Sequence, residues 1–76
     1  MKAFVLIKVK AGDVKQVVNN LQSLKEVTEA HVTFGPYDAV AVVEAPDIDT
    51  LGKVTALEIQ PIPGVEQTLT CLAVDF

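Results

Sequence analysis

Hydrophobic and polar residues follow two different periods along the chain, and these predict four strands and two helices. Stretches that are rich in Val, Ile and Phe, or that alternate between apolar and polar residues, are typical of strands. Between them, apolar residues recur every three or four positions, as they do on the buried face of a helix. The predicted strands span residues 3–10, 27–34, 39–45 and 65–74, and the predicted helices follow Asp13 and Asp47.

Each predicted helix has a start signal and one apolar face. Asp13 can accept hydrogen bonds from the amides of the first helical turn, and Gln16 completes the spacing of a capping box. Asp47 is expected to cap the second helix and Pro61 to end it. The positions expected to point inward are Val14, Val17, Val18, Leu21 and Leu24 in the first helix, and Ile48, Leu51, Val54 and Ile59, with Thr55 beside them, in the second.

The order strand, helix, strand, strand, helix, strand predicts an α+β fold with the ferredoxin-like βαββαβ topology. In this topology a four-stranded antiparallel sheet carries both helices on one face and leaves the other face bare. Residues 1–76 are expected to form a single domain, because a chain of 76 residues is large enough for only one core.

The predicted strands carry apolar side chains on both faces, although an antiparallel sheet with one face in water should alternate cleanly. About ten such side chains in water would form a larger patch than monomers usually expose. We therefore expect the bare face to pack against a second copy, which makes a homodimer with a sandwich or barrel of two sheets. In the first strand, Phe4 and Leu6 point to the face opposite Ala3, Val5, Ile7 and Val9. In the third, Val40 and Val42 are opposite Ala39, Ala41 and Val43. In the last, Leu69, Cys71 and Ala73 are opposite Thr68, Thr70, Leu72 and Val74.

The charge balance argues against two classes of partner. Six lysines, no arginine and ten acidic residues leave a net charge of −4, which disfavours direct binding of nucleic acid. The longest apolar run, residues 3–7, is far shorter than the ~20 residues of a membrane span. It also has no cleavage pattern of a signal peptide, so we expect no membrane association and a cytoplasmic location.

Reactive side chains are few, and we expect no catalytic residue, no metal site and no cofactor. His31 is the only histidine, and a metal site needs three or four ligands at set spacing. Cys71 has no predicted neighbour that would lower the pKa of its thiol, so we expect it to pack as a small side chain.

The turn Gly35-Pro36-Tyr37-Asp38 differs from an ordinary hairpin turn, which would favour Asn-Gly or Asp-Gly. The Asp38 carboxylate beside the Tyr37 phenol could hold the ammonium group of a small amino acid. Alternatively, Asp38 accepts hydrogen bonds from the amides of its own turn and Tyr37 packs on the hairpin. Residue chemistry leaves both interpretations open.

Two passages resemble the C-terminal ligand-binding (RAM) domain of the Lrp/AsnC family. Residues 27–44 (VTEAHVTFGPYDAVAVVE) resemble the family's run of a strand, a G-x-Y-D turn and an apolar strand. Residues 59–73 (IQPIPGVEQTLTCLA) resemble its closing P-G-V passage and T-x-T strand. The chain departs from the family at Gly52 and Thr55, where bulky apolar residues are more common.

The resemblance implies an amino-acid-sensing and oligomerisation module in a form without the family's helix-turn-helix domain. Such domains pair through their sheets, and an octameric ring of four dimers is a further expected assembly. A small amino-acid effector would lie between subunits, and the signal would reach DNA through a full-length Lrp/AsnC regulator. The implied ligand-binding residues are Gly35, Tyr37 and Asp38 of the turn and Thr68 and Thr70 of the last strand.

Two other functions fit the same topology. One is a small dimeric α+β-barrel enzyme of the monooxygenase or isomerase kind, although these usually line their pockets with His, Asn, Trp or Arg, and this chain has one His and neither Trp nor Arg. The other is an assembly module that binds no ligand.

Overall fold

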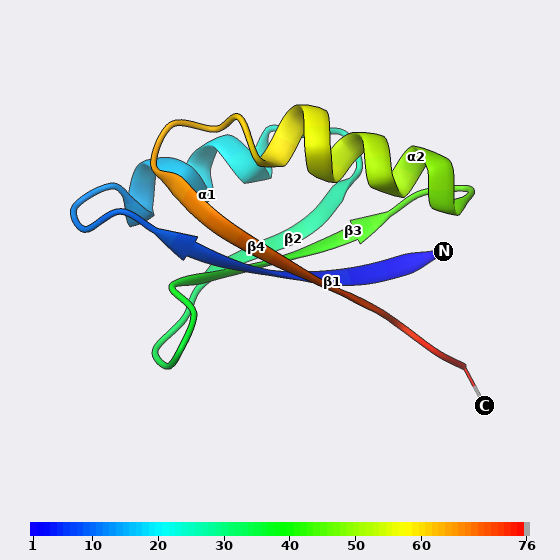
Figure 1. Ribbon diagram of the computed structural model, residues 1–76, viewed down its shortest axis with the longest axis horizontal. Coiled ribbons are helices and arrows are strands. Elements are labelled where there is room, and N and C mark those ends of the chain that lie inside the picture. The colour runs from blue at the N-terminus through cyan, green and yellow to red at the C-terminus, as the bar shows by residue number, and fades with distance from the viewer. Residues whose placement is uncertain (76) are drawn as a thin grey trace.

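The computed structural model describes residues 1–75, and its elements follow the predicted order (Figure 1). The ferredoxin-like α+β fold is therefore confirmed. The elements are β1 (Lys2–Val9), α1 (Val14–Gln22), β2 (Val27–Val32), β3 (Ala39–Glu44), α2 (Ile48–Lys53), the π-helical segment η1 (Val54–Ile59) that continues α2, and β4 (Val65–Leu72).

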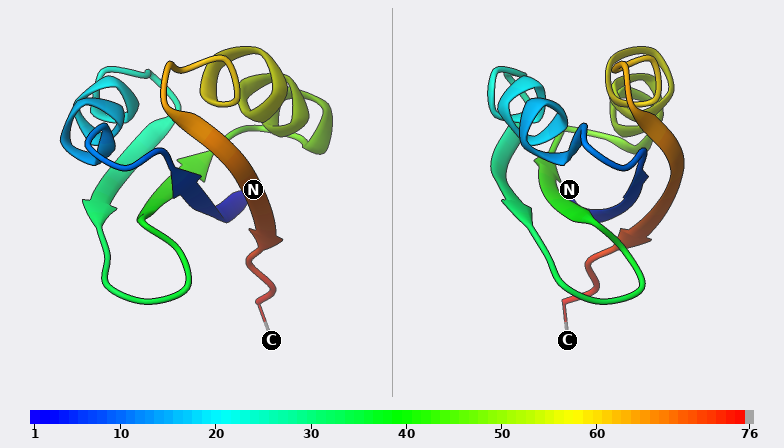
Figure 2. Two further views of the ribbon diagram at one scale, coloured as in Figure 1. Left: turned by 60° about the vertical axis from the view of Figure 1, so that its left-hand side comes forward. Right: turned by 90° about the vertical axis from the view of Figure 1, so that its left-hand side faces the viewer.

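The four strands form one antiparallel sheet in the order β2-β3-β1-β4, so β2 and β4 are its two edges. Both helices lie over the same face, and Figure 2 shows them side by side above the curved sheet. The opposite face carries no helix from the described residues. We call it the helix-free face.

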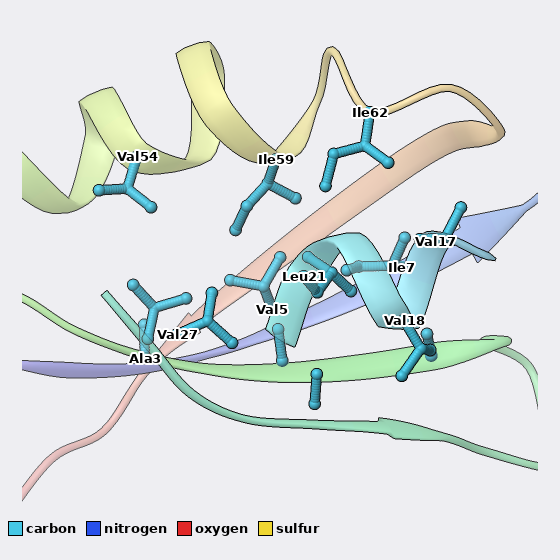
Figure 3. Close-up of a cluster of buried hydrophobic side chains, with 14 of the residues drawn as sticks. Ala3, Val5, Ile7, Val17, Val18, Leu21, Val27, Val54, Ile59 and Ile62 are labelled. Carbon is cyan, nitrogen blue, oxygen red and sulfur yellow. The ribbon is translucent and has the colours of Figure 1, made fainter. Parts of the chain in front are cut away.

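The strand register decides which side chains share a face, because residues that pair across an antiparallel sheet point the same way. Val5 pairs with Ala41 of β3 and with Thr70 of β4, and all three point toward the helices. The core lies between this face and the helices (Figure 3). Its largest fully buried side chains are Ile7, Leu21, Leu51, Ile59, Val5, Val17, Val43 and Val54.

Three strands are shorter than predicted, and at β2 a turn closes before the apolar alternation ends. β2 ends at Val32 rather than at residue 34. The amide of Thr33 donates to the carbonyl of Asp38 at 3.0 Å, and its hydroxyl donates to the carbonyl of Tyr37 at 2.8 Å. These bonds fold residues 33–38 into a loop and leave Phe34 fully exposed. β3 ends at Glu44 rather than at residue 45, and β4 ends at Leu72 rather than at residue 74.

The two helix starts behave differently. Asp47 caps α2 as predicted, since its Oδ1 accepts a hydrogen bond from the amide of Thr50 at 2.7 Å, and this bond lowers the pKa of Asp47. The predicted cap by Asp13 is wrong: within the described residues its side chain makes no capping bond to α1. The Asp13 carboxylate lies against the backbone of Gly64 instead.

The segment η1 explains how the second helix buries its apolar residues. In a π-helix a residue and the fifth one after it lie close to the same face, and Val54 and Ile59 are both buried. At the change from α to π geometry, the Thr55 hydroxyl donates to the carbonyl of Leu51 at 3.0 Å. Leu51 is buried as predicted, but the inward prediction for Ile48 is wrong, because 51% of its surface is exposed.

Candidate functional site

An apolar patch lies at the centre of the helix-free face, as the two-sided strand pattern predicted. It has two rows that cross three strands, one in register with Phe4 and the other with Leu6 of β1. Phe4 is 39% exposed and Leu69 is 48% exposed. The patch is smaller than the ten or so side chains expected, because only two rows are apolar. We call these six residues the helix-free patch: Phe4, Leu6, Val40, Val42, Leu69 and Cys71.

Polar and charged side chains border the helix-free patch. On the β2 side, Glu29 and His31 extend the two apolar rows, and their side chains lie 3.1 Å apart. On β1, the Lys2 ammonium lies 5.7 Å from the centre of the Phe4 ring. An apolar centre with a polar rim is the usual anatomy of a protein–protein interface.

The predicted ligand residues of the turn lie in the loop between β2 and β3. Gly35 has a φ of +141°, which residues with a side chain rarely adopt. Oδ2 of the Asp38 carboxylate accepts a hydrogen bond from the Val9 amide at 2.9 Å. The Asp38 amide donates one to the carbonyl of Ile7 at 2.9 Å. Asp38 therefore ties the loop to β1, rather than accepting amides of its own turn.

Thr68 and Thr70 lie on β4, with side chains on the helix side of the sheet. Their backbone groups face outward. The Ala73 amide donates to the carbonyl of Lys2 on β1, and residues of a strand alternate in the direction of their N–H and C=O groups. The amide and carbonyl groups of Thr68 and Thr70 therefore point to the free edge of the sheet. The Thr68 hydroxyl also accepts a hydrogen bond from Gln60 Nε2 at 3.1 Å.

A groove of about 390 Å³ runs between the second helix and β4, and it includes Thr70. We call it the α2–β4 groove. Ile48 and Leu72 lie at its sides and are about half exposed, at 51% and 47%. Its lining residues are Ile48, Leu51, Gly52, Thr55, Ala56, Gln60, Thr70 and Leu72.

The five predicted ligand-binding residues fall into two groups, one in the β2–β3 loop and one on β4. The loop with Gly35, Tyr37 and Asp38 projects away from the helices, below the sheet in Figure 1. Thr68 and Thr70 lie across β1 from Asp38, at the β4 edge, and their side chains point toward the helices. In one protomer the loop and the two threonine side chains thus extend toward opposite sides of the sheet.

The sequence interpretation missed the α2–β4 groove. Its signal was present in the small residues Gly52 and Ala56, which stand four positions apart in the second helix. A Cβ atom placed on Gly52 would have no described atom within 4 Å other than its immediate surroundings in the helix, so this side of the helix is open.

Among the described residues, neither helix has the length and hydropathy that a membrane span requires.

Comparisons with known proteins agree on one kind of domain. The family model "Lrp/AsnC ligand binding domain" matches residues 2–75. The "HTH-type transcriptional regulator FL11" of Pyrococcus horikoshii is 40% identical over 72 residues, which are 95% of this chain and 47% of the regulator. The chain thus spans about half the length of the curated relatives it matches.

Solved structures resemble the fold closely. The protein TTHA0845 of Thermus thermophilus has a TM-score of 0.93 at 36% identity, and the match covers 99% of this chain and 94% of that one. Escherichia coli AsnC has a TM-score of 0.91 at 33% identity, and the match covers 99% of this chain and 51% of AsnC. The second match places the resemblance in one half of a longer regulator.

Proposed function

Because the chain belongs to the Lrp/AsnC ligand-binding domain family, we propose that it senses a small amino acid between its own subunits and passes the signal on through its assembly. The relatives are regulators of transcription, which favours a sensor over an enzyme, so the proposal includes no catalytic step. It also keeps the cytoplasmic location expected from the sequence.

The observation that carries the proposal is the helix-free patch, since an effector held between subunits requires a surface on which subunits pair. Two of its residues, Phe4 and Leu69, are partly exposed. Full burial of a large apolar side chain is worth about 1.5–3 kcal/mol, and a symmetric dimer covers every such residue twice. Pairing through this face would therefore be favourable, and an octameric ring of four dimers is a further step of the same proposal.

The free edge of β4 supplies groups that match the main chain of an amino acid. The outward amides of Thr68 and Thr70 can donate to an α-carboxylate, and the carbonyls beside them can accept from an α-ammonium group. In the proposed site, Gly35, Tyr37 and Asp38 of a neighbouring subunit form the facing wall. One oxygen of Asp38 is held by Val9, and its second oxygen would meet the ammonium group.

An effector in this site would change assembly only through its different affinity for the two assembly states. The signal would reach DNA through a full-length regulator of the same family that associates with this domain. This route agrees with the negative net charge and the absence of arginine, which disfavour direct contact with phosphates.

Native mass spectrometry and thermal denaturation across the twenty amino acids at millimolar concentration test the proposal. We expect at least one amino acid to shift the distribution of assemblies and to raise the melting temperature, because a ligand that binds only the folded state stabilises it. If no amino acid changes either measurement, the chain is an assembly module without a ligand and the proposal is wrong.

A further inference from the structure

The α2–β4 groove adjoins the outward backbone groups of Thr70, so the side chain of an amino acid bound at that edge would enter the groove. From its lining we infer that the effector carries an uncharged, apolar side chain. This inference rests on the proposed function, and it adds the class of amino acid that the site selects.

The chemistry of the lining supports this class. None of the described residues that line the groove is charged. Its polar groups are the Thr55 and Thr70 hydroxyls and the Gln60 amide. The Thr55 hydroxyl already donates its hydrogen bond to the carbonyl of Leu51. A charged side chain in the groove would lose water without gaining an opposite charge, which is costly.

The shape of the groove points the same way. Its volume of about 390 Å³ falls in the usual range for small-molecule sites, which are mostly apolar with a few polar groups. Ile48 and Leu72 are half exposed at its sides, and an aliphatic side chain between them would cover apolar surface that otherwise meets water. Gly52 leaves room for that side chain, because no described atom outside the helix lies near the place of its missing Cβ.

Titration of the amino acids in a calorimeter tests this class directly. We expect leucine, isoleucine, valine or methionine to bind at least tenfold more tightly than aspartate, glutamate, lysine or arginine. If a charged amino acid binds as tightly as the best aliphatic one, the inference is wrong while the proposed function stands. If no amino acid binds, the proposed function fails and this inference fails with it.

A Gly52→Leu variant tests whether the groove receives the side chain. Leucine has a higher helix propensity than glycine, and the added side chain enters open space, so the melting temperature should stay the same or rise. Affinity for the large aliphatic amino acids should nevertheless fall at least tenfold. The matched control is Lys53→Leu, which adds the same side chain at the next helix position, outside the groove, and should leave affinity unchanged.

The two variants separate a filled groove from a general defect. Loss of affinity in both would show that the helix surface as a whole matters, and unchanged affinity in Gly52→Leu would show that the side chain lies elsewhere. Either result overturns the inference.

Discussion

Asp38 connects two parts of the chain that are 29 residues apart in sequence. Its carboxylate accepts a hydrogen bond from the amide of Val9, a residue that is only 6% exposed. Its own amide donates a hydrogen bond to the carbonyl of Ile7. The side chain thus holds the β2–β3 loop against the end of β1. A ligand-binding role would add to this structural one, because the two roles use different carboxylate oxygens.

Substitutions at Asp38 should separate these roles. Asp38→Ala leaves the buried Val9 amide without its acceptor, which should lower the free energy of unfolding by about 1–3 kcal/mol. Asp38→Asn keeps an oxygen acceptor without the charge and should lose much less stability, while weakening the binding of any amino acid whose ammonium group the carboxylate holds. Urea denaturation measures the first effect and calorimetry the second. Wild-type stability in the alanine variant would contradict the structural role.

Two glycines with positive φ should respond differently to alanine. Gly64 has a φ of +99°, and an added Cβ would lie 2.8 Å from Asp13 Cβ and 3.1 Å from Val17 Cγ2. Gly35 has a φ of +141° but no described atom near the place of a Cβ. Gly35→Ala should therefore cost only backbone strain, about 1–2 kcal/mol, and Gly64→Ala should cost more. Thermal denaturation of both variants checks the order, and equal melting temperatures would contradict it.

At the scale of elements, the start of α2 is held by a titrating cap. The amide of Thr50 donates to the Asp47 carboxylate, and this hydrogen bond lowers the pKa of Asp47 in the folded protein. A carboxyl with a lowered folded pKa stabilises the fold above its unfolded pKa, and that stability is lost as the pH falls through the folded value. The unfolded value is near the usual 3.8, so the cap should weaken below about pH 4.

An Asp47→Asn variant isolates this effect, because asparagine also caps helices well but does not titrate. Between pH 5 and pH 2.5 the wild type should lose more thermal stability than the variant, and above pH 5 the two curves should run parallel. Melting temperatures measured by circular dichroism across this range provide the test. Parallel curves over the whole range would show that the cap bond contributes nothing to the acid sensitivity of the fold.

Element order and type could be predicted from the sequence because hydrophobic periodicity reports burial, and burial is what the fold requires. Element ends could not. The alternation of β2 continues to Phe34, but the two hydrogen bonds of Thr33 close the loop first. The cap assigned to Asp13 failed because its carboxylate lies against Gly64, a residue 51 positions later whose approach only the tertiary fold determines.

The candidate site was predictable to a different extent. The helix-free patch could be predicted from strand alternation, which needs only the sequence. One of its residues, Val42, is nevertheless covered by its neighbours and only 7% exposed. The α2–β4 groove depends on how the second helix sits over β4, and the change to π geometry in η1 is part of that packing. Val54 and Ile59 were both expected inward, but their interval of five, which is longer than the three or four of an α-helix, was not interpreted as a change to π geometry.

At the scale of the whole molecule, the sheet has one face covered by helices and one covered by nothing in the described chain. Glu29, His31 and Lys2 border apolar residues that two copies could bury against each other. The proposed site would also bring the G-x-Y-D loop of one copy to the T-x-T strand of another. Both features lead to the same expectation, which is that the functional unit contains at least two chains.

A charge placed in the helix-free patch should separate the subunits. Leu69→Lys introduces an ammonium group into the helix-free patch on the edge strand β4, where pairing of two copies would bury it without an opposite charge. The dissociation constant should rise at least a hundredfold. Leu57→Lys is the matched control, since Leu57 is 70% exposed on η1, outside the patch, and it should leave the assembly unchanged. Size-exclusion chromatography of both variants measures the effect, and equal elution would contradict the proposed interface.

The mass in solution tests the central claim most directly. Sedimentation equilibrium of the wild-type chain at micromolar concentration should give at least twice the 8.1 kDa of one chain, because we propose that a second copy covers the apolar helix-free face. A mass of 8.1 kDa that persists throughout the micromolar range would contradict the claim, because the helix-free face would then be stable in water and a site between subunits could not form.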